Sequence, residues 1–161
     1  SNSTPVAHRI AADLIEEGIS VDEVYRFVYD TVPQVRLHLL GDVLQTLETT
    51  EDAKIAWISV TQDALKKNEA SSNDLEGVVN YIRSIDSVEV AIVANELETG
   101  DTKISMRSKT NVDVGQICGL YDGGGHARAA GCLIQEPLYE ALAKVVASTR
   151  LHIDGWNSKS E

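Results

Sequence analysis

The sequence predicts an α/β fold in which helices flank a mixed β-sheet and an N-terminal helical segment precedes the sheet. Residues 1–46 carry apolar residues at helical spacing, and from about residue 46 short apolar runs typical of strands begin. Hairpin turns and helix-capping patterns both separate these runs, which indicates a sheet with antiparallel and parallel connections. We place the boundary near residues 45–50 and expect a helical segment over 1–46 and a second domain over 47–161.

Three helices are expected in the N-terminal segment. Pro5 follows a threonine N-cap and begins a helix whose apolar stripe stops at Gly18. Ser20 opens a capping box that predicts the start of a second helix. Pro33 begins the third helix, and its predicted apolar face consists of Leu37, Leu40, Val43 and Leu44.

Four strands and one helix follow. The helix is predicted over 73–84 from a capping pattern at Asn73. The first two strands are joined by an acidic turn at 51–52, and the last two by a hairpin turn at 98–101. The four predicted strands are 46–50, 54–60, 87–96 and 103–108.

The remaining elements surround a glycine-rich stretch, GGGHARAAG, at residues 123–131. We expect a short helix over 111–120 before the glycines and a second short helix beginning at His126. A strand near 132–135 and a final helix begun by Pro137 complete the predicted fold.

The charge of the chain narrows the class of ligand. Its 161 residues have a formal net charge of −11, which argues against sequence-independent binding of a long duplex, because that binding relies on many contacts of lysine and arginine with phosphates. Residues 103–131 carry four lysines or arginines against two aspartates, a local charge of +2. A small phosphorylated ligand or a short oligonucleotide suits such a local anion site on an acidic body.

The expected environment is the cytoplasm. The N-terminus lacks the basic and apolar layout of a signal peptide, and no apolar run approaches the roughly 20 residues of a membrane helix. Cys118 and Cys132 are too few for a disulfide framework and are interpreted as buried thiols. The only methionine is Met106, which favours an excised piece of a longer protein.

The glycine stretch is the first candidate for chemistry. Three glycines let backbone N–H groups converge on an anion, the expected helix would add its positive N-terminal end, and His126 could add a hydrogen bond to a phosphate oxygen. A glycine-rich turn of purely structural purpose has the same pattern, so the spacing alone leaves both readings open.

The strand SMRSK at 105–109 is the second candidate. Its alternation is expected to place Ser105, Arg107 and Lys109 on one outward face. Arg107 could clamp a phosphate bidentately, with Ser108 as a hydroxyl donor. The alternative is a solvated strand edge whose charges discourage aggregation.

The predicted helix over 73–84 supplies Asn80 and Arg83 as further candidates. Arg83 could instead complement the negative C-terminus of that helix. The four histidines show none of the spacings that metal-ligand motifs use, so we expect no metal ligand and no catalytic residue in this chain.

Taken together, GGGHARAAG, SMRSK and the segment EGVVNYIRSIDSVEVAIV at 76–93 resemble the DHHA1 domain of the DHH phosphoesterase family. The resemblance is to the type that combines oligoribonuclease and pAp phosphatase activities, within the RecJ-like superfamily. It implies a DHHA1-like fold over 47–161 and a helical linker from the end of a DHH domain over 1–46.

The resemblance also implies roles. A DHH domain that binds Mn²⁺ or Mg²⁺ would precede this chain, and the DHHA1 domain would grip short single-stranded RNA or nucleotide phosphates, with His126 assisting at the phosphate. A homodimer without membrane contact is compatible with it. The substrate-binding residues that it implies are Asn80, Arg83, Arg107, Ser108, Gly123, Gly124, Gly125 and His126.

Three functions remain open from the sequence. The first is the substrate-binding part of a phosphoesterase that hydrolyses short oligoribonucleotides and 3′,5′-bisphosphate nucleotides. The second is a fragment of a RecJ-like single-strand DNA exonuclease, which the acidic balance disfavours because long strands reward a basic groove. The third is a non-catalytic nucleotide- or RNA-binding module.

Overall fold

The computed structural model describes residues 3–157. They form two compact units, one ending at Gln34 and one beginning at Val35. The first unit consists of α1 (Pro5–Glu16) and α2 (Val21–Tyr29), and the N-terminal caps are as predicted. Thr4 Oγ1 accepts a hydrogen bond from the Ala7 N–H at 3.2 Å, and neither helix has a buried residue.

The third predicted helix is present as α3 (Gln34–Leu44), and all of it after Gln34 belongs to the second unit. The predicted apolar face was partly wrong, because the buried side chains are Leu39 and Val43 whereas Leu37 is 55% exposed. Leu39 and Val43 pack in a core with side chains of the sheet. The compact unit therefore begins before the change of residue pattern near residues 45–50.

The second unit is built on a six-stranded mixed sheet, as the sequence predicts. The strand order is β1-β2-β3-β4-β6-β5, and all neighbours are antiparallel except β2 and β3. The strands are β1 (Glu48–Thr49), β2 (Ile55–Val60), β3 (Val90–Glu96), β4 (Thr102–Ser108), β5 (Gly124–His126) and β6 (Ala129–Ile134).

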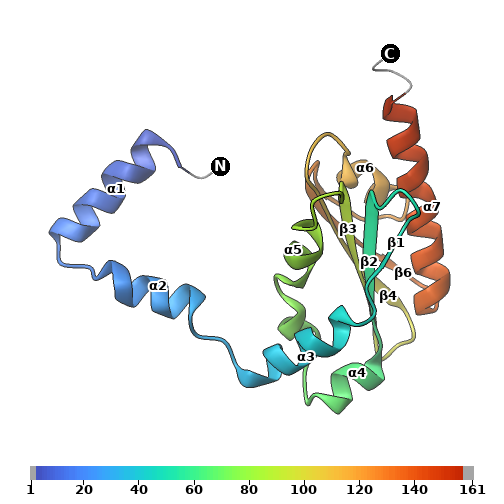
Figure 1. Cartoon of the computed structure of the whole chain (residues 1–161), viewed down its shortest axis with the longest axis horizontal. Coiled ribbons are helices and arrows are strands. Elements are labelled where there is room, and N and C mark those ends of the chain that lie inside the picture. Colours follow the sequence, from blue (N-terminus) through green and yellow to red (C-terminus); the bar gives the residue numbers. More distant parts are fainter. Residues whose placement is uncertain (1–2, 158–161) are drawn as a thin grey trace. The chain divides into compact units, whose positions relative to one another are not determined.

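Helices cover the two faces of this sheet unequally (Figure 1). On one face, α3, α4 (Gln62–Lys67) and α5 (Val78–Arg83) pack on β2 and β3. On the other face, α6 (Val114–Gly119) and α7 (Leu138–Asn157) contribute to a larger core that extends from β2 to β6. The core that α3, α4 and α5 form contains residues of β2 and β3 and none of β4, β5 or β6. On this face of the sheet, β4, β6 and β5 therefore make up an uncovered half.

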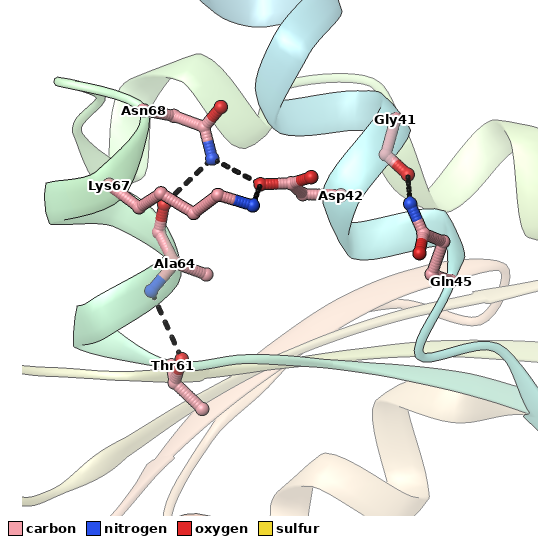
Figure 2. Close-up of polar contacts among 7 residues, drawn as sticks. All are labelled: Gly41, Asp42, Gln45, Thr61, Ala64, Lys67 and Asn68. Carbon is pink, nitrogen blue, oxygen red and sulfur yellow. Dashed lines mark hydrogen bonds and ion pairs between the residues drawn. The ribbon is translucent and has the colours of Figure 1, made fainter.

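The sequence did not predict α4, although Thr61 is a regular N-cap whose Oγ1 accepts from the Ala64 N–H at 3.1 Å. Figure 2 shows how α4 is tied to α3. Asp42 accepts hydrogen bonds from Lys67 Nζ at 2.7 Å and from Asn68 Nδ2 at 2.8 Å. The hydrogen bonds from Lys67 and Asn68 lower the pKa of Asp42, so this link weakens when the carboxylate is protonated.

Two predicted helices are shorter than expected. The one over 73–84 is split into a 3₁₀ turn, η1 (Ser72–Leu75), and α5, because Gly77 between them has a left-handed φ of 82°. The one over 111–120 begins only at Val114, where the Asp113 carboxylate accepts a hydrogen bond from the Gln116 N–H. No helix among residues 3–157 is long and apolar enough to cross a membrane.

The helix expected from His126 was wrong, because residues 124–134 form the hairpin of β5 and β6. Contacts distant in sequence hold the connection between the two strands. The Ala127 carbonyl accepts from the Val114 N–H at 2.9 Å, and the Arg128 carbonyl accepts from the Ser108 N–H at 3.2 Å. Neighbouring elements therefore hold this segment as two strands joined by a turn at 127–128, and not as a helix.

The three glycines before His126 differ in what the fold requires of them. A Cβ at Gly123 would lie 2.3 Å from the Cys132 Cβ, and one at Gly125 would lie 2.5 Å from the Ala129 oxygen, where φ is also 146°. A Cβ at Gly124 would meet nothing within 4 Å. The fold requires glycine at 123 and 125 only.

We predict that Gly123→Ala lowers the free energy of unfolding by about 1–3 kcal/mol through overpacking, whereas Gly124→Ala changes it by less than about 0.5 kcal/mol. Urea unfolding of the two variants measures the difference. Equal stabilities of the two variants would contradict the close packing of Gly123 on Cys132.

Candidate functional site

The uncovered half of the sheet aligns two of the residues that the sequence singled out. Arg107 of β4 pairs with Ala129 of β6, which pairs with His126 of β5. Residues directly opposite in neighbouring strands project to the same face, so Arg107 and His126 lie in one row with only an alanine between them. Two strand spacings separate their backbones by roughly 10 Å.

The next row of residues on the same face has small side chains or none. Ser105 of β4 pairs with Gly131, which pairs with Gly124. A ligand could therefore approach the backbone closely between Arg107 and His126. The edge strand β5 also leaves some of its N–H groups unpaired by β6, and such groups suit a phosphate.

A cavity of about 370 Å³ lies beside Arg107, where the covered half of the sheet meets the open half. Its floor comes from β3 and β4 and its wall from η1 and the start of α5. The cations at the site are Lys103, which is exposed, and Arg107, which is half-buried. The lining residues of the sheet are Val93, Asn95, Lys103, Ser105 and Arg107.

Arg107 is partly positioned by its own strand. Its Nη1 donates a hydrogen bond to the Met106 carbonyl at 2.9 Å. A guanidinium has five donors, so most of them stay available for a phosphate after this contact. Arg107 is thus held at the cavity and can still bind an anion bidentately.

Two neighbours of Arg107 do not join it in the site. Ser108 is 1% exposed and points to the opposite face, where its Oγ lies 3.5 Å from the Ala127 oxygen. Lys109 Nζ donates to the carbonyls of Ile85 and Asp86 after α5. The structure therefore does not bring Ser108 together with Arg107, and it commits the Lys109 ammonium to backbone carbonyls.

Asn80 and Arg83 both lie on α5 at the border of the open face. Asn80 is exposed and Arg83 is half-buried in the last turn. Arg83 lies four residues after Val79, which lines the cavity, so the two project from the same side of the helix. Arg83 is in this respect the better placed of the two.

The glycine stretch supplies a surface different from the one expected. His126 is exposed on the edge strand and does not begin a helix. The helix that begins nearby is α6, and its first N–H, of Val114, donates to the Ala127 carbonyl. Gly124 is exposed and open to solvent on the Arg107 side, whereas Gly123 and Gly125 serve the packing described above. An anion at this surface would be held by side chains and strand amides.

Behind the glycines lie the two cysteines, which are buried and free as predicted. The Gly123 N–H donates to the Cys118 carbonyl at 3.0 Å. A hydrogen bond with Cys132, together with burial, raises the pKa of the Cys118 thiol. Cys118 therefore stays protonated and acts as packing beneath the glycine stretch.

The sequence missed the residues that close the cavity. Asn95 is 3% exposed, and its Nδ2 donates to Ser72 Oγ at 2.9 Å. An available signal was the single amide in the otherwise apolar run VAIVAN of β3. Asn73 carried a helix-capping signal but no signal of a binding site, and Ser72 carried neither, because only the fold brings η1 to the strand.

A metal site finds no support among residues 3–157, which contain no cluster of three or more His, Cys, Asp or Glu side chains able to hold an ion. What the described residues offer is a set of cations, amides and small residues at an open sheet face.

The chain is similar to a known domain family and to several known proteins. The family model of the DHHA1 domain matches residues 52–150, which include the sheet from β2 to β6 and most of α7. The bifunctional oligoribonuclease and PAP phosphatase NrnA of Thermus thermophilus is 29% identical over 151 residues, which are 93% of this chain and 44% of that protein. The chain thus spans less than half the length of this relative.

Two other proteins are similar to this chain over different shares of its length. Oligoribonuclease NrnB of Bacillus subtilis is 44% identical over 45 residues, 27% of this chain and 11% of that protein. The A-adding tRNA nucleotidyltransferase of Aquifex aeolicus is 25% identical over 145 residues, 89% of this chain and 17% of that protein.

The solved structure of an exopolyphosphatase-related protein from Bacteroides fragilis is 30% identical, with a TM-score of 0.85 over 93% of this chain and 44% of that one. The site therefore stands on a fold that recurs in this group of proteins. The family model matches well over half of the chain, and the chain belongs to the DHHA1 domain family.

Proposed function

We propose that this chain is the substrate-binding part of a DHH-family phosphoesterase that hydrolyses short oligoribonucleotides and 3′,5′-bisphosphate nucleotides. The observation that carries the proposal is the row of Arg107, Ala129 and His126 on the uncovered half of the sheet. A cation and an imidazole on either side of a small residue can hold a phosphate from two directions. Similarity to two oligoribonucleases supports RNA as the substrate class.

The size and charge of the surface favour a short ligand. The basic residues are few and local, while the whole chain carries −11. A long strand would need an extended basic and aromatic groove. The few cations around the cavity instead match a ligand of one to a few phosphates.

The residues of this chain would bind and orient the substrate. Arg107 would hold one phosphate, His126 and the strand amides near Gly124 would contact a phosphate oxygen, and Arg83 would add charge at the border. Fixed donors of this kind stabilise charge on phosphate oxygens without having to reorganise. The proposal assigns Mn²⁺ or Mg²⁺ to a DHH domain elsewhere in a longer polypeptide.

A second candidate is a non-catalytic RNA-binding module. The observation that favours it is the similarity to A-adding tRNA nucleotidyltransferases, which extends over 84–89% of this chain. The same surface would then hold an RNA end without hydrolysis. The two candidates differ in whether the complete polypeptide cleaves a phosphodiester bond.

We predict that the complete polypeptide with Mn²⁺ cleaves RNAs of two to five nucleotides faster than longer RNA or any DNA, and that the 161-residue chain alone shows no turnover. A length series of labelled RNA and DNA oligomers measures both. Preference for long DNA would support the exonuclease alternative, and turnover by the chain alone would contradict the division of roles. Binding without any cleavage by the complete polypeptide would support the RNA-binding module.

We predict that Arg107→Ala in the complete polypeptide lowers kcat/KM for a dinucleotide about 10- to 100-fold, because a charge-assisted hydrogen bond to phosphate is lost. Lys109→Ala is the matched control, since it removes a cation two residues away that binds backbone carbonyls. Steady-state kinetics on both variants test the assignment. An equal loss in the two variants would contradict a specific grip by Arg107.

A further inference from the structure

The cavity beside Arg107 has two kinds of surface. Apolar side chains of Leu75, Val79 and Val93 form one part of its lining. A planar aromatic ring packs favourably on such side chains, whereas a phosphate gains nothing from them. This part of the cavity suits a nucleobase.

The polar part of the lining offers both donors and acceptors. Ser72 Oγ accepts a hydrogen bond from Asn95 Nδ2, so the hydroxyl hydrogen of Ser72 is free to donate elsewhere. Asn73 beside it brings a further amide to the cavity. Asn95 Oδ1 is a buried acceptor that has no hydrogen-bond partner among the residues that the structure describes.

Such a mixture fits a base edge and not a second phosphate. The edge of a nucleobase presents N–H donors and ring-nitrogen or carbonyl acceptors side by side. A phosphate has acceptors only, and it would meet the Glu76 carboxylate on the same wall. The two cations that line the cavity, Lys103 and Arg107, both come from β4, and Arg36 behind the wall donates from Nη2 to the Glu76 carbonyl.

The volume also limits the occupant. About 370 Å³ is near the lower end of the range for ligand pockets, which suits one nucleoside and not a run of several. The cavity opens beside Arg107, so a nucleoside inside it would be directly linked to the phosphate held there.

We infer that this cavity is a nucleoside subsite in which Ser72, Asn73 and Asn95 read the edge of the base next to the phosphate bound by Arg107. The inference rests on the proposed function and adds a specificity-determining part to it. The base packs on the apolar wall, and η1 supplies the polar groups that orient its edge.

Titration of the 161-residue chain with AMP, ribose 5-phosphate and inorganic phosphate, followed by NMR, tests the subsite. AMP is expected to bind about fivefold to tenfold tighter than ribose 5-phosphate, the effect of one or two hydrogen bonds, and to shift the Asn95 side-chain amide signal. Ribose 5-phosphate and inorganic phosphate are expected to shift the Arg107 region and to leave the Asn95 amide unchanged.

Single-residue variants test whether the tighter binding of AMP comes from the polar residues of the cavity. Asn73→Ala and Ser72→Ala, both at exposed positions, are expected to reduce the advantage of AMP over ribose 5-phosphate without weakening ribose 5-phosphate. Asn111→Ala, an exposed asparagine outside this cavity, is the matched control and should keep the full advantage. Equal binding of AMP and ribose 5-phosphate by the unaltered chain, or no binding of AMP, would overturn the subsite.

The proposed function has a separate readout in the turnover of short RNA by the complete polypeptide. If the complete polypeptide cleaves short RNA but AMP and ribose 5-phosphate bind equally well, only the nucleoside subsite is contradicted. If AMP binds more tightly than ribose 5-phosphate but the complete polypeptide does not cleave RNA, the subsite is supported and the phosphoesterase proposal is contradicted.

Discussion

The candidate site depends on the incomplete cover of one face of the sheet. The helices α3, α4 and α5 bury β2 and β3, and no residue of β4 belongs to the core that they form. Most of the uncovered positions of β4 and β6 carry polar or small residues, namely Lys103, Ser105, Arg107, Ala129 and Gly131, whereas Leu133 opposite Lys103 is 50% exposed. The step between the covered and open halves forms the cavity.

The opposite face makes this arrangement possible. There the same strands contribute Ile104, Met106 and Cys132 to a core shared with α6 and α7. Because side chains alternate along a strand, β4 can be a core strand on one side and a ligand-binding strand on the other. Each functional residue of β4 is consequently flanked by buried neighbours that hold its backbone in place.

The glycine stretch has a structural half and an accessible half. Gly123 and Gly125 allow the edge strand to lie against Cys132 and Ala129 at distances that no side chain permits. Gly124 has no such constraint, and it lies in the row next to His126 on the open face. The sequence left open whether the glycines have a purely structural purpose. Two of the three, Gly123 and Gly125, have such a purpose, whereas Gly124 is accessible to a ligand.

The sequence by itself determined what local signals encode. Periodicity and caps predicted α1, α2, α3 and α7 and most strands, and the alternation of SMRSK placed Arg107 outward. That alternation also places Ser108 on the face opposite to Arg107, against the expectation that the two bind one phosphate together. Only the tertiary structure decided that residues 124–134 form a hairpin and that η1 closes a cavity over Asn95. Both depend on partners distant in the chain, such as Val114 for Ala127 and Ser72 for Asn95, and a local pattern carries no information about such pairs.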